Sequence, residues 1–179
     1  MLIINVPIGK ESYDEVSKKF SRETFELALE HSLVSLSKWE SFFEKPFLSD
    51  KEKTAEEVYW YVRAMTLTSD VPEEVFENLT KENFDDIDNY INAKMTATWF
   101  SEGHSKKTGQ VITAELIYSW MIDAGIWKEC ENWHLAKLFT LIRVRGQQNA
   151  PQKKMSRNEI LQKQRELNAQ RRARLGTSG

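Results

Sequence analysis

The chain has 179 residues, a mass of 20.9 kDa and a formal net charge of −2, with 40% hydrophobic and 29% charged residues. This length fits one domain with an appendage better than two full domains, and the composition excludes collagen-like, mucin-like and wholly disordered chains. Because there is no long apolar run and no signal-peptide pattern, we expect neither a membrane protein nor a secreted one. The single cysteine cannot form an internal disulfide, which indicates a reducing compartment.

The N-terminal residues predict a small β element. Residues 2–6 (LIINV) are mostly β-branched and are bounded by Pro7 and Gly9, and residues 25–29 alternate large apolar side chains with smaller or charged ones. The second stretch also fits the first turn of a helix. We predict a half-buried strand there, paired with residues 2–6.

Helices are predicted for most of the chain that follows. No glycine lies between Gly9 and Gly103, which argues against a series of tight hairpins. The first helix should run from about Ser32 to Lys45. It should end before Pro46, because the residue preceding a proline is disfavoured in helical conformation.

A second helix has a clear start signal. Thr54 and Glu57 have the spacing of a capping box, in which each side chain binds the other residue's backbone N–H. Pro72 should start a third, short helix, where its missing N–H costs nothing, and residues 85–93 (DDIDNYINA) continue the helical pattern. The apolar stripe predicted for the second helix consists of Val58, Tyr61, Val62 and Met65.

A less regular region should precede the last helices of the domain. Residues 96–100 (TATWF) have the composition of a short strand, and residues 102–109 are predicted to form a polar loop. Thr113 should then cap a helix that ends at Gly125. The buried face of that helix should contain Leu116, Ile117, Trp120, Met121 and Ala124.

A long helix is predicted from about Lys128 to Arg145, with Gly146 as its C-terminal stop. Its buried face should contain Leu135, Leu138, Phe139 and Ile142. We therefore expect a mainly α fold with a small N-terminal β element, in which residues 1–150 form a helical domain that folds by itself.

The last segment differs from the rest in charge. Residues 151–179 contain eight basic and two acidic residues, a net charge of +6, which leaves −8 for residues 1–150. Ser156 and Glu159 form a second capping box, which predicts a linker followed by a helix that extends to about Leu175. Because large apolar residues are few in this helix, we expect it to project or to dock by a thin stripe.

The sequence offers little support for a catalytic or metal site. Cys130 and His134 are four residues apart on the predicted helix, but zinc needs three or four ligands and no second pair is present. Asp85, Asp86 and Asp88 lack the glycine and glutamate of a calcium loop. Glycine-rich phosphate loops, G-x-S-x-G and H-E-x-x-H are absent, so we expect no catalytic residue, metal or cofactor.

Two features predict contacts with other molecules. Trp60 lies between Tyr59 and Tyr61 on a helix that is aromatic nearly all round, so it either fills the core or belongs to an oligomer or partner interface. The basic helix is a solvated surface, a protein-binding element or a nucleic-acid-binding element. Nucleic-acid binding is disfavoured because no aromatic residue follows Phe139 to stack on bases. The predicted partner-binding residues are Trp60, Ile160, Leu161, Arg165, Leu167, Arg171, Arg172 and Arg174.

Several segments also carry a family resemblance. They are residues 35–40 (SLSKWE), 45–47 (KPF), 95–100 (MTATWF), 112–118 (ITAELIY), 133–143 (WHLAKLFTLIR), 154–157 (KMSR) and 167–176 (LNAQRRARLG). From about Phe25 to its end, the chain resembles a family of small proteins of tailed bacteriophages that are encoded in the tail region and are often described as tail assembly chaperones.

The resemblance implies a non-enzymatic function in the host cytoplasm during phage assembly, with the tape-measure protein of the tail as the partner. It also implies that a short form and a frameshifted long form can exist. Amphipathic helices with surplus aromatic residues could cover the apolar stripes of a long helical partner. The alternatives are a virion component, at the head–tail junction or in the tail, whose basic helix hooks a neighbouring subunit, and a nucleic-acid-binding accessory protein. A homo-oligomer remains open.

Overall fold

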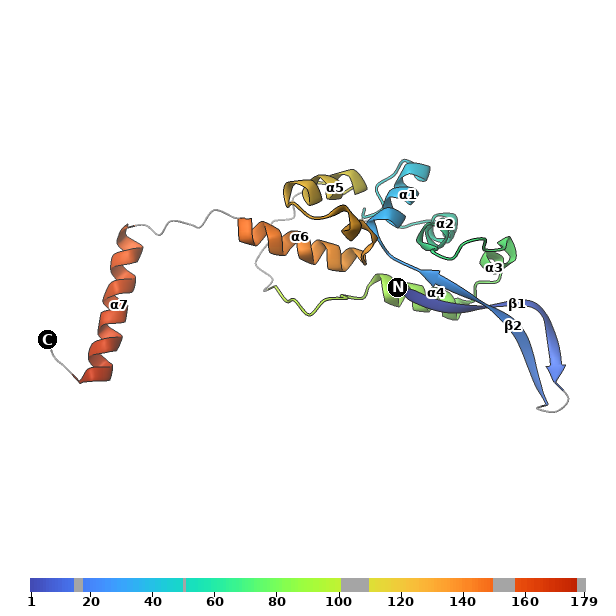
Figure 1. Ribbon diagram of the computed structural model, residues 1–179, viewed down its shortest axis with the longest axis horizontal. Coiled ribbons are helices and arrows are strands. Elements are labelled where there is room, and N and C mark those ends of the chain that lie inside the picture. The colour runs from blue at the N-terminus through green and yellow to red at the C-terminus, as the bar shows by residue number, and fades with distance from the viewer. Residues whose placement is uncertain (15–17, 50, 101–109, 150–156, 177–179) are drawn as a thin grey trace. The chain divides into compact units, whose positions relative to one another are not determined.

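The computed structural model describes residues 1–14, 18–49, 51–100, 110–149 and 157–176. Over these residues the chain is mainly helical, with one two-stranded antiparallel sheet at its N-terminus (Figure 1), which confirms the expected fold class. The chain divides into two compact units, Met1–Gln148 and Asn149–Gly179.

The N-terminal hairpin consists of β1 (Leu2–Asp14) and β2 (Lys19–Leu29). The predicted pairing is confirmed, although both strands are longer than predicted. The register shifts between Ile8 and Ser12, beside Gly9, whose φ of 67° suits glycine best. Alternation along the strands places one face on the core, and its buried residues are Ile4, Val6, Leu27 and Leu29.

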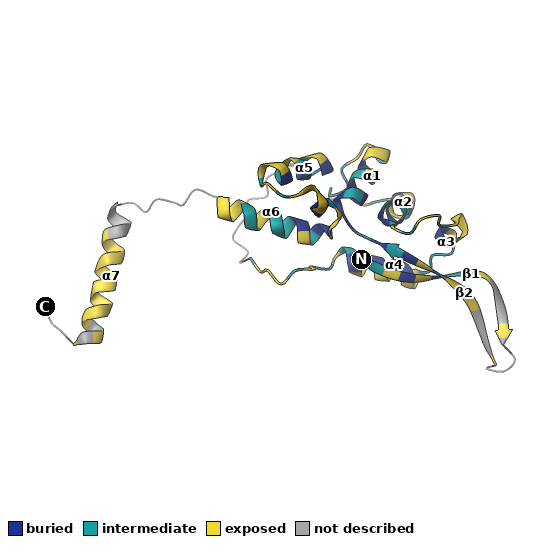
Figure 2. Cartoon of the chain, in the orientation of Figure 1, coloured by how far each residue is buried: buried dark blue, intermediate teal, exposed yellow. Residues whose placement is uncertain are grey.

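Seven α-helices and one 3₁₀ helix are described, and buried residues alternate with exposed ones along α1, α2 and α5 (Figure 2). Serine or threonine caps explain where three of the helices begin. The Ser32, Thr54 and Thr80 side chains each accept a hydrogen bond from the backbone three residues on, and the side chain there bonds back. The helices are α1 (Leu33–Phe43), α2 (Ala55–Met65), α3 (Glu73–Glu77), α4 (Lys81–Ile91), α5 (Ala114–Asp123), η1 (Lys128–Asn132), α6 (Leu135–Asn149) and α7 (Arg157–Leu175).

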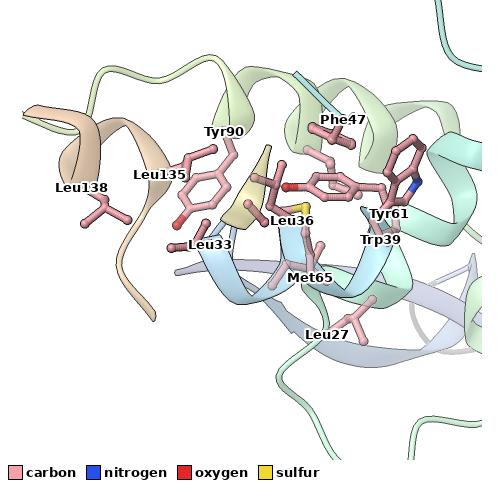
Figure 3. Close-up of a cluster of buried hydrophobic side chains, with 14 of the residues drawn as sticks. Leu27, Leu33, Leu36, Trp39, Phe47, Tyr61, Met65, Tyr90, Leu135 and Leu138 are labelled. Carbon is pink, nitrogen blue, oxygen red and sulfur yellow. The ribbon is translucent and has the colours of Figure 1, made fainter. Parts of the chain in front are cut away.

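The core of the first unit joins the hairpin to α1, α2, α4 and α6 (Figure 3). Tyr61 of α2 stacks on Phe47 with the ring centroids 4.0 Å apart. The Trp39 indole N–H of α1 donates to the Glu57 carbonyl of α2 at 2.8 Å, which fixes the two helices against each other. Side chains with almost no exposed area include Leu27, Leu33, Leu36, Met65 and Leu138.

Three apolar stripes are less buried than predicted. In α6, Leu135 and Leu138 are buried, but Phe139 and Ile142 are only partly covered. Tyr61, Val62 and Met65 of α2 are buried, but Val58 is exposed. In α5, Ile117 and Met121 are buried, whereas the predicted core residues Leu116, Trp120 and Ala124 are only partly covered. Thr113 precedes α5 as predicted, but its side chain makes no capping hydrogen bond.

The strand predicted over residues 96–100 is wrong, since these residues have no regular structure. Trp99 is 76% exposed, and the Thr98 N–H bonds locally to the Thr96 hydroxyl at 3.1 Å. A strand needs a partner edge, and β composition alone does not create one. The predicted loop 102–109 and the predicted capping box at Ser156 lie outside the described residues.

The long helix predicted over residues 128–145 is two elements, η1 and α6. His134 lies between them, and its Nδ1 accepts a hydrogen bond from the Ala136 N–H at 3.2 Å. The Leu135 N–H donates to the distant His31 carbonyl at 2.8 Å, in place of the bond that a continuous helix would make.

The predicted stop at Gly146 is also wrong, because α6 continues to Asn149. Gly146 does not have the positive φ with which glycine ends a helix, whereas Gly125 after α5 does, at 60°. Glycine therefore marks the end of only one of the two helices for which we predicted it.

Candidate partner-binding surface

An exposed aromatic cluster lies between α1 and α2. Phe42 of α1 and Trp60 of α2 stack with their ring centroids 4.2 Å apart and an interplanar angle of 26°. Phe42 is 56% exposed and Trp60 is 36% exposed. Trp60 is thus at the surface, where an interface residue has to be, and it presents its ring together with that of Phe42.

These rings belong to a shallow groove of about 230 Å³, which we call the aromatic groove. Packing between α1 and α2 holds its walls in place, because Trp39 is buried and bonded to α2 while Phe42 and Phe43 contact each other edge to face at 4.9 Å. The groove is lined by Lys38, Trp39, Phe42, Phe43, Trp60, Arg63 and Ala64.

The charged side chains of the aromatic groove are basic. Lys38 is exposed at one part of the lining. The Arg63 guanidinium lies 4.9 Å from the centroid of the Tyr59 ring and 5.8 Å from that of Trp60, and it also pairs with Glu73 of α3. Above all, the hydrogen bond that the guanidinium donates to the Glu73 carboxylate raises the pKa of Arg63, so its positive charge is fixed.

A second depression adjoins the aromatic groove, since Trp39 lines both, and we call it the lysine depression. Lys45 bonds to the Glu57 carboxylate at 2.7 Å and holds the pKa of that carboxyl below its usual range. Lys53 lies 4.3 Å from the centroid of the Phe47 ring. The depression is lined by Trp39, Lys45, Pro46, Ser49, Lys51, Glu52, Lys53, Thr54 and Glu57.

The predicted residues of the basic helix lie on α7, in the second unit. The side chain of Ile160 lies outside the described residues. Each of the others is exposed, and Leu161 and Leu167 keep 44% and 45% of their area accessible (Figure 2). They are Leu161, Arg165, Leu167, Arg171, Arg172 and Arg174.

Cys130 and His134, the pair four residues apart in the sequence, are both buried. His134 is buried, and since its Nδ1 accepts a hydrogen bond, its Nε2–H donates to the Tyr90 carbonyl at 3.0 Å. Burial raises the pKa of the Cys130 thiol, which disfavours the thiolate that binds metals. Within the part of the chain that is described, no three His, Cys, Asp or Glu side chains gather closely enough to hold a metal ion.

Trp60 was predicted from the sequence as a partner-binding residue, whereas Phe42 and the lysines beside it were not. A signal for Phe42 was present, because it falls one residue off the stripe that includes Leu36, Trp39 and Phe43, and so points away from the core. The lysines of residues 45–53 follow α1 in a segment without regular pattern, so only the structure places them beside Trp39.

Comparisons of the chain with protein-family models, with curated proteins and with solved structures find no match. None of the described helices is long and apolar enough to cross a membrane. The aromatic groove and the exposed basic helix are therefore the features on which a function can be based.

Proposed function

We propose that this chain is a non-enzymatic tail assembly chaperone of a bacteriophage, which binds the tape-measure protein through the aromatic groove. The observation that carries the proposal is the exposed, stacked pair of Phe42 and Trp60. Aromatic rings dominate the energetics of protein interfaces, and a groove between two helices suits an amphipathic helix of the partner.

The geometry supports reversible rather than permanent binding. The groove is small, so an anchor of one or two apolar side chains fills it. Its walls are held by the bond between Trp39 and Glu57, so little ordering is needed when a partner docks. A chaperone that works in the host cytoplasm and then leaves the assembled tail needs this combination.

The exposed α7 supports a second contact with a protein. Leu161 and Leu167 would anchor it, and the arginines would orient it against carboxylates through bidentate hydrogen bonds. The same exposed helix also supports the alternative function, a virion component at the head–tail junction or in the tail. Protein composition of purified virions separates the two functions, because a chaperone is absent from the particle and a component is present.

The binding test uses the full chain and purified fragments of the tape-measure protein from the same genome. Calorimetric titration should show binding that weakens at least tenfold when Phe42 and Trp60 are both replaced by Ser, since the buried apolar area is lost. Trp99→Ser is the matched control, because Trp99 is still more exposed but lies away from the groove. Equal affinity of all three proteins, or no binding by the unmodified chain, would contradict the proposal.

A further inference from the structure

The charge around Trp39 is opposite to that of the domain that carries it. Residues 1–150 have a net charge of −8. The described residues that line the aromatic groove and the lysine depression include five basic and two acidic side chains, a net charge of +3. The basic ones are Lys38, Lys45, Lys51, Lys53 and Arg63.

From this reversal of charge we propose that the segment bound in the aromatic groove is an acidic amphipathic helix, with leucine-type anchors beside Glu or Asp. This inference rests on the proposed function, since it concerns the same groove, and it names the chemistry of the bound segment. The rings of Phe42 and Trp60 receive the anchors. Lys38 of the aromatic groove and Lys51 of the lysine depression face the carboxylates.

The two acidic lining residues do not cancel this preference. Glu57 is bonded to Lys45 and Glu73 is bonded to Arg63, so each of these pairs is neutral as a unit. The remaining positive charge belongs to lysines. Glu52 stands against Lys51 and Lys53 in the same depression. A basic helix would meet like charges on both sides of Trp39, which costs binding energy and slows association.

The test measures full-length protein against two synthetic peptides with leucines at the same i, i+3, i+4 and i+7 positions. One peptide has Glu at the flanking positions and the other has Lys. At low salt we expect the Glu peptide to bind at least tenfold more tightly by fluorescence anisotropy. This advantage should shrink as salt is raised from 50 to 200 mM, because exposed charges are screened.

Variants make the result specific to this surface. Lys38→Glu combined with Lys51→Glu should abolish or reverse the preference for the Glu peptide. Lys81→Glu combined with Lys128→Glu, an equal change in charge at exposed residues outside the surface, should keep it. Equal affinities, tighter binding of the Lys peptide, absence of binding by both peptides, or an unchanged preference in the double variant would each overturn the inference. Binding of tape-measure fragments is measured separately, so the proposed function can stand while this inference fails.

Discussion

His31 connects three elements through a buried side chain and its own backbone. Its Nδ1 lies 2.6 Å from the Tyr61 hydroxyl, and its ring contacts that of His134 with the centroids 5.1 Å apart. Glu30 is the nearby acidic group, bonded by the Tyr90 hydroxyl at 2.6 Å and by the N-terminal amine. Burial, followed by the charge of His134, lowers the pKa of His31 to about 4.

The pKa of His31 predicts that acid weakens the fold. An unfolded histidine takes up a proton near pH 6.5 and native His31 only near pH 4, so the unfolded state binds more protons between these values and stability falls as pH falls. His134, with its pKa also lowered by burial, acts in the same direction. Between pH 7 and pH 5, the His31 contribution should lower the free energy of unfolding by about 2 kcal/mol. Urea unfolding at the two pH values measures the total change.

The matched variant for this measurement is His31→Gln, provided that its circular dichroism remains native. Its loss of stability between pH 7 and pH 5 should shrink to the smaller part that His134 supplies. An unmodified protein whose free energy of unfolding stays constant or rises over that interval would contradict the assignment.

Glu40, and not the predicted Thr113, caps the N-terminus of α5 with its side chain. One carboxylate oxygen accepts from the Phe47 N–H at 2.8 Å, and the other accepts from the Ala114 N–H, the first of α5, at 2.7 Å. Glu40 is buried, and its negative charge lies at the positive end of the helix. Because the bond joins residues 74 positions apart, no local motif predicts it.

Glu40→Gln should lower the free energy of unfolding by about 2–3 kcal/mol, because the amide nitrogen turns a donor toward one of the two buried N–H groups. Denaturant unfolding measures this change. Glu44→Gln, an exposed change one turn later, should stay within about 0.5 kcal/mol of the unmodified protein. Equal effects at the two positions would show that the carboxylate is not the cap of α5.

At the scale of single elements, local signals succeeded where local bonds decide the structure. The capping box of Thr54 and Glu57 is formed as predicted, because its partners are three residues apart. The break between η1 and α6 and the end of α6 were missed, since a bond to His31 decides the first and nothing at Gly146 forces the second. The aromatic groove was predicted only in part. The pattern of one helix predicted Trp60 as a partner-binding residue, whereas Phe42, on which it stacks, belongs to another helix.

Two threonines that precede helices should therefore respond differently to replacement. Thr54→Ala removes an N-cap hydrogen bond and should cost about 1 kcal/mol of stability. Thr113→Ala removes no capping bond and should cost less than about 0.5 kcal/mol. Chemical unfolding of both variants in parallel provides the comparison, and a larger loss for Thr113→Ala would be the opposite of what we expect.

Gly146 offers a stabilising change inside α6. A Cβ added there meets no atom within 4 Å, and the residue is already helical. Gly146→Ala should therefore raise the melting temperature, with a gain of about 0.5–1 kcal/mol from reduced backbone entropy of the unfolded chain. Gly125→Ala is the matched control and should destabilise, because its φ of 60° is unfavourable for alanine. A loss at both positions would refute the helical assignment of Gly146.

At the scale of the whole molecule, charge and the scarcity of apolar residues after Pro151 predicted a separate C-terminal segment. The predicted boundary follows residue 150, and the first compact unit of the structure ends at Gln148. Deleting residues 151–179 should leave a cooperative thermal transition within a few degrees of that of the full chain, since α7 exposes its described side chains. Loss of cooperativity in scanning calorimetry would assign α7 to the core.

The bond between the Leu135 N–H and the His31 carbonyl has a consequence for how the protein is made. The buried α1 residues Leu33 and Leu36 leave the ribosome long before Leu135 and Leu138 of α6 can complete the core. At about 5–20 residues per second, the roughly hundred residues from Leu33 to Leu135 take about 5–20 s to translate. During that interval the apolar side chains of the nascent chain are exposed and can aggregate. Expression at low temperature, or together with a chaperone that binds nascent chains at the ribosome, should therefore raise the soluble yield.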